Sequence, residues 1–146
     1  MQPANRFLTI LKLFHLHAAY IFVGLEQEYF YLVRANYFAD LKWYNFAIGN
    51  YKKALKKSND PGIKAAVGWC YFQLGQMKKS VENYRKAYDK SKHPNIAIGL
   101  AYAEYNCGNI DECRKIVSTL PDSIFELDAT HEKDIMRLKT LLEARP

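Results

Sequence analysis

Cysteine pairs are missing from this sequence of 146 residues. Its three cysteines, Cys70, Cys107 and Cys113, are an odd number and show no CxxC spacing. Each falls in a helical pattern where a small apolar residue would serve, so we expect all three to be reduced core residues. A chain of this length buries enough apolar surface to fold as one domain, so a disulfide framework is not needed.

Motifs for catalysis and for metal binding are also missing. The sequence contains no GxGxxG, P-loop, HExxH or GxSxG. His15 and His17 are two positions apart, about 200° around a helix, and so cannot share one ion, while His93 and His131 stand alone. Cys70 has no neighbouring base that would activate it. We therefore expect no enzyme activity, catalytic residue, metal, cofactor or small-molecule substrate.

Acidic residues are scarce in the middle of the chain, where most of the net charge of +6 resides. This stretch should attract acidic surfaces. Its densest part is a basic face on one predicted helix, opposite the apolar stripe, formed by Lys52, Lys53, Lys56 and Lys57. Two interpretations stay open for this face: a solvated surface, or a contact with an acidic protein segment or anionic lipid. Nucleic acid is an unlikely partner, because no basic patch is interleaved with aromatic residues on one face.

A repeat with a fixed period dominates the rest of the sequence. Residues of the same class recur at an offset of 33, as in the pairs Tyr51 and Tyr84, Ala54 and Ala87, Pro61 and Pro94, and Gly75 and Gly108. Within each period the pattern predicts a helix, a tight turn and a second helix. One helix pair cannot bury its apolar stripe alone, so neighbouring pairs must stack.

The second repeat shows the pattern most clearly. Asp60 and Pro61 are typical of a helix start, and Gly75 of a helix end. The period also aligns small residues, which we expect at close helix crossings: Ala47, Gly68, Ser80, Ala87 and Ala101.

On these residues the sequence resembles the tetratricopeptide-repeat (TPR) family over about residues 27–121. The family's signature positions are occupied in the second repeat by Val67, Gly68, Tyr71, Gly75, Ser80, Tyr84 and Ala87. The first repeat departs from the signature at Arg34 and Lys42. The third has Glu104 in the tyrosine position, and a competing register would align Gly99 and Tyr102 with Gly68 and Tyr71.

The resemblance implies an all-α fold, an α-α superhelix of three helix pairs with an extra helix at each end. We expect three units: an apolar N-terminal helix in residues 1–25, three TPR-like repeats in 26–121 and a C-terminal capping helix in 122–146. The last rests on the amphipathic pattern of Ile135, Leu138, Leu141 and Leu142, with Asp128 or Thr130 as its cap.

The N-terminal helix has three open interpretations. Residues 7–23 are mostly apolar and would span about 26 Å, just short of a bilayer's hydrocarbon core. They could pack on the first repeat and a partner, anchor the chain in a membrane, or serve as a secretory signal. Lys12 and two histidines argue against lipid, and the lack of an AxA-like site argues against cleavage. We expect a cytoplasmic or membrane-associated protein, with Arg6 holding the N-terminus inside if the helix spans.

In the family that the sequence resembles, the first helix of each repeat lines a concave groove. Carried over position by position, the groove residues are Tyr29, Leu32 and Asn36 from the first repeat, Ala65, Trp69, Phe72 and Gln73 from the second, and Ile98, Tyr102, Tyr105 and Asn106 from the third. The family's Lys, Asn and Arg clamp on a peptide carboxylate is not met, since Leu32 and Ala65 stand where it needs basic residues. Trp69 and Phe72 could instead pack on a neighbouring helix of the same chain.

Two functions follow from the resemblance. The first is a non-catalytic protein-interaction module, an adaptor or assembly subunit of a larger complex that binds an apolar peptide or helix in its aromatic groove. The second is a dedicated chaperone for a secreted client, similar to the translocator chaperones of type III secretion. Those chaperones are acidic, however, whereas this chain is basic.

Overall fold

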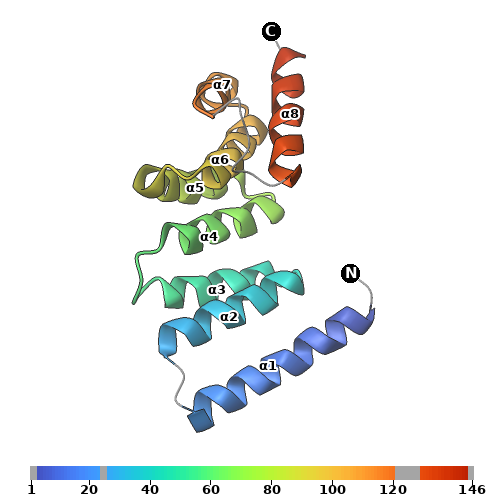
Figure 1. Cartoon of the computed structure of the whole chain (residues 1–146), viewed down its shortest axis with the longest axis vertical. Coiled ribbons are helices and arrows are strands. Elements are labelled where there is room, and N and C mark those ends of the chain that lie inside the picture. Colours follow the sequence, from blue (N-terminus) through green and yellow to red (C-terminus); the bar gives the residue numbers. More distant parts are fainter. Residues whose placement is uncertain (1–2, 24–25, 121–128, 145–146) are drawn as a thin grey trace.

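The chain is all-helical in the computed structural model, which describes residues 3–23, 26–120 and 129–144. Within these ranges it forms eight helices and no strand: α1 (Pro3–Val23), α2 (Gln27–Asp40), α3 (Tyr44–Ala54), α4 (Pro61–Gln73), α5 (Met77–Ser91), α6 (Pro94–Cys107), α7 (Ile110–Ser118) and α8 (Ala129–Glu143). The helices stack along one axis, with α1 at one end and α7 and α8 at the other (Figure 1).

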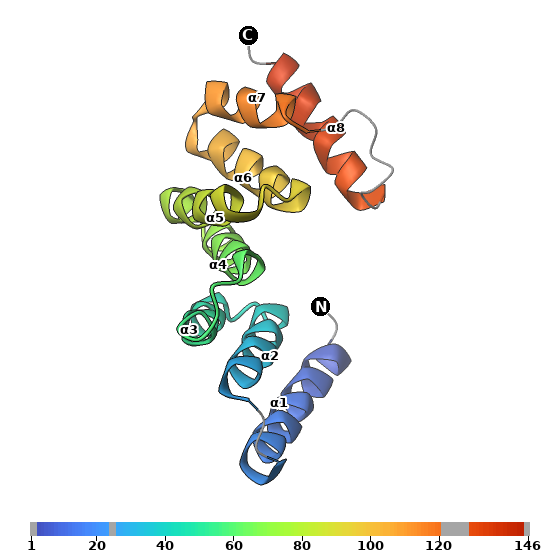
Figure 2. The same cartoon turned by 60° about the vertical axis from the view of Figure 1, so that its left-hand side comes forward.

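Three helix pairs form the centre of the stack, as the repeat period predicts. They are α2–α3, α4–α5 and α6–α7, and each first helix packs on the second helix of the pair before it. Turning the molecule by 60° keeps this order (Figure 2), so the pairs form a continuous solenoid. The expected α-α superhelix with an extra helix at each end is confirmed.

The turns inside the pairs settle the register of the third repeat. Lys42, Gly75 and Gly108, which are spaced by the repeat period, each have a positive φ, of 62°, 71° and 88°. The following backbone N–H groups, of Trp43, Gln76 and Asn109, donate to the carbonyls of Phe38, Tyr71 and Glu104. Glu104 therefore occupies the position of Tyr71, and the competing register is excluded. Lys42 holds a left-handed conformation that usually favours glycine.

A close crossing at the middle of the stack explains why that competing register looked plausible. The ring of Tyr84 lies between Gly68 of α4 and Gly99 of α6, and a Cβ atom on either glycine would come within 2.9 Å or 2.4 Å of the ring. Both glycines thus face the same side chain. The small residues expected at close crossings, Ala47, Gly68, Ser80, Ala87 and Ala101, are all buried.

In the third repeat a buried carboxylate, paired with an arginine, occupies the position that an aromatic side chain has in the other two repeats. The Glu104 carboxylate is buried and pairs with Arg85 of α5, while Asn109 Nδ2 donates to its other oxygen at 2.6 Å. Arg85 also reaches Glu112 at 3.1 Å. Because its oxygens are hydrogen-bonded, this carboxylate can lie where Phe38 and Tyr71 lie in the other repeats.

The two end helices attach differently. Helix α8 packs on α6 and α7 and buries Ile135, Leu138 and Leu142, whereas α1 packs mainly on α2. No helix in the described part of the chain is long and apolar enough to cross a bilayer. Gly24 follows the apolar run 7–23 and is a plausible helix end, but it falls outside the described residues. So do the expected cap at Asp128 and the side chains of Thr130 and His131.

Candidate functional site: a concave groove

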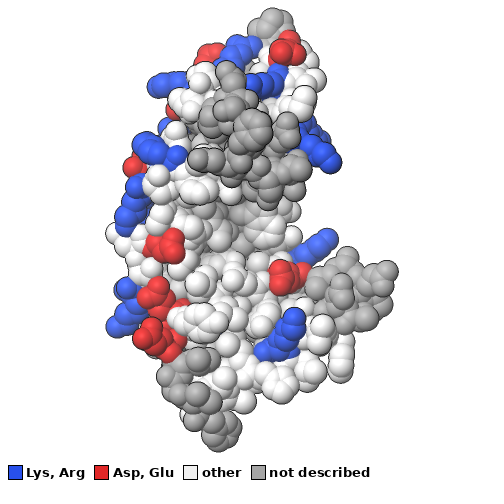
Figure 3. Space-filling view, in the orientation of Figure 1, with Lys and Arg blue, Asp and Glu red and all other residues white. Residues whose placement is uncertain are grey.

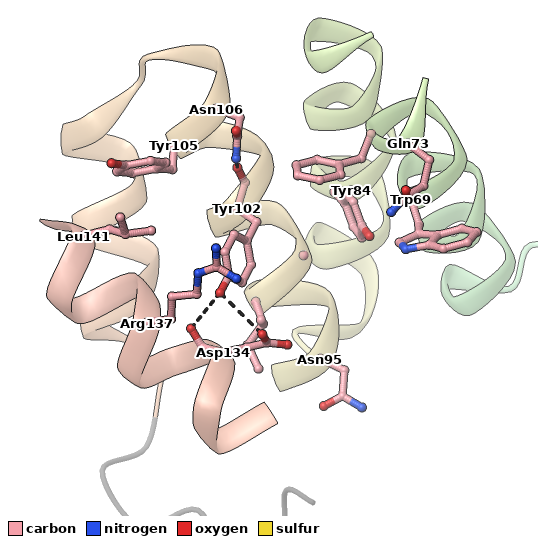
Figure 4. Close-up of a pocket in the computed structure, with 13 residues that line it drawn as sticks. Trp69, Gln73, Tyr84, Asn95, Tyr102, Tyr105, Asn106, Asp134, Arg137 and Leu141 are labelled. Atoms are coloured by element: carbon pink, nitrogen blue, oxygen red, sulfur yellow. Dashed lines mark hydrogen bonds between the residues drawn. The ribbon is translucent and has the colours of Figure 1, made fainter. Parts of the chain in front are cut away.

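A groove of about 760 Å³ opens between α4, α6 and α8 on the concave side of the stack. Its walls carry Trp69, Phe72 and Gln73 from α4, Tyr84 from α5, Asn95, Ile98, Gly99, Tyr102, Tyr105 and Asn106 from α6, and Asp134, Arg137 and Leu141 from α8. Figure 4 shows the aromatic rings of α4 and α6 facing this space, with α8 closing its far side.

Four aromatic side chains define the groove, in two pairs that the repeat period relates. Trp69 and Phe72 share one face of α4, and one repeat later Tyr102 and Tyr105 share the same face of α6. Trp69 is exposed and the other three are half-buried. Tyr44 of α3 packs edge-on against Trp69, with their ring centroids 5.4 Å apart, and so restricts the movement of the indole. The rings are therefore held in place yet partly open to solvent.

Polar groups within the groove are fixed by hydrogen bonds to α6 and α8. The Tyr102 hydroxyl donates to the Asp134 backbone oxygen at 3.0 Å and lies 3.4 Å from its carboxylate. Burial, and then the charge of Asp134, raise the pKa of Tyr102. Asn106 Nδ2 donates to the Tyr102 carbonyl at 2.8 Å. Arg137 extends beside Tyr102 (Figure 4), so α8 brings one charge of each sign to the groove.

Helix α8 supplies three groove residues that the sequence did not indicate as such, in addition to Tyr84, Asn95 and Gly99. Asp134, Arg137 and Leu141 each stand one position before Ile135, Leu138 or Leu142, the residues that pack on the last repeat. The amphipathic pattern identified the packed face. It gave no indication that the adjacent face turns toward α6, because that depends on the tilt of α8 on the stack.

The other predicted groove residues lie outside this space. Ala65 borders an adjoining hollow of about 530 Å³, which shares Trp69, Tyr84 and Asn95 with the groove. Leu32 of α2 packs on the core of the first repeat, and Asn36 Oδ1 accepts a hydrogen bond of 2.6 Å from Tyr51. Tyr29 is exposed near the start of α2. The first repeat therefore does not contribute to the groove.

The basic face lies apart from the groove. Lys52, Lys53, Lys56 and Lys57 are all exposed. Lys52 Nζ donates to the Tyr71 hydroxyl at 3.2 Å, and Lys53 Nζ lies 5.1 Å from the centre of the Tyr31 ring. In the view of Figure 3 the charged side chains gather along the left edge and around the top, with a few more at the lower right, and the face between them is largely uncharged.

The described cysteines and histidines form no cluster of reactive groups. All three cysteines are free; Cys70 and Cys113 are buried as expected, but Cys107 is only half-buried, because it is the last residue of α6. Burial raises the pKa of the Cys70 thiol to about 12, which keeps it protonated at neutral pH. His93 Nδ1 caps α6 by accepting from the Asn95 N–H. Among the described residues no three His, Cys, Asp or Glu side chains cluster as metal ligands would.

Solved structures with the same helix arrangement identify this architecture. Yeast Tom70 matches with a TM-score of 0.66 and 26% identity over 80% of this chain, and the Sgt2 TPR domain from Aspergillus fumigatus with 0.68 and 17% over 84%. The chain has the tetratricopeptide-repeat fold. It spans 24% of the Tom70 chain and 86% of the Sgt2 domain.

A third TPR structure contains a bound peptide. The first TPR domain of Spaghetti (RPAP3), bound to the HSP90 peptide SRMEEVD, matches with a TM-score of 0.69 and 13% identity, over 80% of this chain and 96% of that one. No protein-family model and no curated protein matches the sequence. The expected family resemblance is thus confirmed at the level of the fold.

Proposed function

We propose that this TPR chain is a non-catalytic adaptor or assembly subunit that binds an apolar segment of another protein in the groove between α4, α6 and α8. The observation that carries the proposal is the joint placement of Trp69, Phe72, Tyr102 and Tyr105 around one open space. Aromatic side chains bury a large area on binding and lose few rotamers, so they are favoured anchors of protein interfaces.

The polar groups of the groove favour a peptide over a purely apolar ligand. Gln73, Asn95 and Asn106 offer amide donors and acceptors beside the rings. Such groups can form hydrogen bonds with the backbone N–H and C=O groups of a bound segment, which would otherwise lose their hydrogen bonds to water. The rings then take its apolar side chains.

The partner differs in kind from a peptide held by its C-terminal carboxylate. That mode needs basic side chains where this chain has Leu32 and Ala65, and Leu32 packs on the core of its own repeat. The only basic side chain lining the described groove is Arg137, which lies beside Asp134. We therefore propose an internal apolar segment or helix as the ligand.

The test is capture of the native partner, followed by affinity measurements on groove variants. The protein would be isolated from its own cells without detergent. The affinity of the co-purifying partner for the purified variants would then be measured. We expect Trp69→Ala and Tyr102→Ala each to weaken binding by about 2 kcal/mol or more, roughly thirtyfold, because both rings lie at the centre of the groove.

Trp43 provides a matched control for the loss of a tryptophan. Its indole is exposed at the start of α3 and borders no part of the groove. Trp43→Ala should leave partner affinity unchanged, with helical content verified by circular dichroism for every variant. Full binding by the Trp69→Ala and Tyr102→Ala double variant would show that the partner contacts another surface.

A further inference from the structure

The outer face of α1 carries most of the exposed large apolar side chains of the described stack. Phe7, Phe14 and Ile21, which recur at heptad spacing, are 70%, 71% and 70% exposed, and Leu8, Ile10 and Leu11 beside them are also exposed. Contiguous apolar patches of this kind are rarely left on a soluble monomer without a partner.

The opposite face of α1 is what holds the helix on the protein. Thr9 and Leu16 are buried there, and Tyr20 stacks on Phe30 of α2 with ring centroids 4.1 Å apart. His17 meets the same Phe30 ring edge-on at 5.2 Å. The exposed apolar residues therefore point away from the rest of the chain, at the free end of the stack (Figure 1).

The charges of α1 fit an anionic surface. The helix carries Arg6 and Lys12, both exposed, and no acidic residue. On a helical projection these cations lie on opposite sides of the apolar face, where it meets the packed face. The nearest acidic residues in sequence, Glu26 and Glu28, begin α2 beyond the other end of α1, so the N-terminal half of α1 is the basic part.

The width of the apolar face favours a plane over a single partner helix. At about 100° per residue its exposed apolar side chains, from Ile10 through Phe14 and Leu11 to Leu8, span an arc of about 160°, within which His15 is the one polar residue. A seam between two helices is a narrower stripe. A helix lying in a membrane interface buries a broad apolar face beneath the headgroups while flanking cations contact anionic lipid.

We propose that α1 binds the surface of a membrane containing anionic lipid, lying in the interface with Phe7, Leu11 and Phe14 inserted below the headgroups. The helix lies along the surface and does not cross, in keeping with its length and composition. The helices that line the groove, α4, α6 and α8, lie in the middle and at the other end of the stack (Figure 1). This proposal is independent of the ligand of the groove.

Co-sedimentation with lipid vesicles tests the proposal on the full chain. Vesicles of phosphatidylcholine alone would be compared with vesicles that contain about one-quarter phosphatidylglycerol. We expect clear binding to the anionic vesicles, and at least a tenfold loss of partitioning in the Phe7→Ser and Phe14→Ser double variant. Replacing both cations, by Arg6→Gln and Lys12→Gln, should weaken binding about tenfold and remove most of its salt dependence.

Two controls separate this surface from the rest of the molecule. Phe46→Ser removes an equally exposed phenylalanine from α3, and Trp69→Ala alters the groove; both should bind vesicles as the unchanged protein does. Since Phe7 and Phe14 are exposed, their replacement should leave helical content and melting midpoint unaltered.

Three results would overturn the proposal. One is failure of the unchanged protein to bind anionic vesicles. Another is equal vesicle binding by the Phe7→Ser and Phe14→Ser double variant. The third is a stable dimer in light scattering that the double variant abolishes, without vesicle binding, because α1 would then be an interface between two copies of this chain.

Discussion

The two end helices, α1 and α8, place their apolar residues differently relative to the repeat stack. Each flanks an open end of the repeat stack. Helix α8 turns its apolar residues inward onto α6 and α7, and its adjacent face completes the groove with Asp134, Arg137 and Leu141. Helix α1 uses a narrow face to contact α2 and directs its largest apolar residues outward.

The difference shows that an apolar end helix need not be a cap. In α8 the buried residues are apolar and the remaining described ones largely polar, which is the pattern of a helix whose only apolar contact is with its own chain. In α1 apolar residues lie on both faces, more than α2 can cover. An excess of this kind indicates a second contact.

The largest effect that would test this contrast is loss of the α8 anchor. Leu138 is fully buried beneath the last repeat, whereas Met136 on the same helix is 62% exposed. We expect Leu138→Ala to lower the free energy of unfolding by about 2–5 kcal/mol through the cavity it leaves. Met136→Ala should change it by less than about 0.5 kcal/mol. Urea denaturation followed by circular dichroism measures both, and equal midpoints would mean that α8 is only loosely attached.

The next largest effect on stability is expected in the middle of the stack, where α4, α5 and α6 cross closely. Gly99 leaves no room for a side chain because the buried Tyr84 ring lies against it, and Gly68 blocks the ring from the other side. Gly99→Leu should therefore cost about 1–3 kcal/mol by overpacking, and Gly68→Leu a similar amount. Gly49, in α3, has nothing within 4 Å of an added Cβ, so Gly49→Ala should instead stabilise the helix slightly. An unchanged melting midpoint for both leucine variants would contradict this account of the crossing.

A smaller effect is expected at the anchor of α1. Leu16 is buried, yet α1 has its main contact with α2 only and can adjust its position. Leu16→Ala should cost about 1–2 kcal/mol, below the usual range for a buried leucine, because the helix can move to fill the space. In hydrogen exchange the amides of α1 should lose protection in this variant before those of α8 do. If both helices lose protection together, α1 is as firmly integrated as α8.

The sequence predicted the parts of this structure that depend on a periodic pattern. The repeat period predicted the three helix pairs, the turns at Gly75 and Gly108 and the small residue Gly68 beside Tyr84, because the same packing recurs in each repeat, but it did not predict Gly99 on the other side of that ring. It did not give the partner of Glu104. That carboxylate replaces an aromatic residue and is paired by Arg85, which lies on a different helix, α5, and belongs to no motif.

The α4 and α6 walls of the candidate groove were largely predictable from the sequence, including Gln73, Ile98 and Asn106 as well as the aromatic residues. Trp69 and Phe72, with Tyr102 and Tyr105, follow from helix spacing and the period. The absence of Leu32 and Asn36 from the groove, and the presence of Arg137, depend on tertiary geometry. Leu32 and Asn36 belong to α2, and α3 and α4 lie between that helix and α6. Helix α8 approaches α6 at an angle that its own sequence does not specify.

The smallest predicted effect concerns the hydrogen bond that joins α8 to the groove. The Tyr102 hydroxyl donates to the Asp134 backbone oxygen at 3.0 Å, so Tyr102→Phe removes one partly buried hydrogen bond without changing the ring. We expect a loss of about 0.5–1 kcal/mol at neutral pH. Tyr29→Phe, on an exposed ring of α2, should have no effect.

The pH dependence of this loss gives a sharper test than its size. The pKa of Tyr102 is raised in the folded chain, first by burial and then by Asp134, so the unfolded chain loses this proton at a lower pH than the folded chain does. The stability that Tyr102 contributes is therefore fully present below about pH 10 and is lost as pH rises further. Other groups with a raised pKa, such as Cys70, contribute equally to both proteins and cancel in the comparison. Urea midpoints measured at about pH 8 and above about pH 10 should show the gap between the unchanged protein and Tyr102→Phe closing at the higher pH. A gap that stays constant would mean that the hydroxyl does not hold α8 against α6, and that Leu138 and its apolar neighbours do so alone.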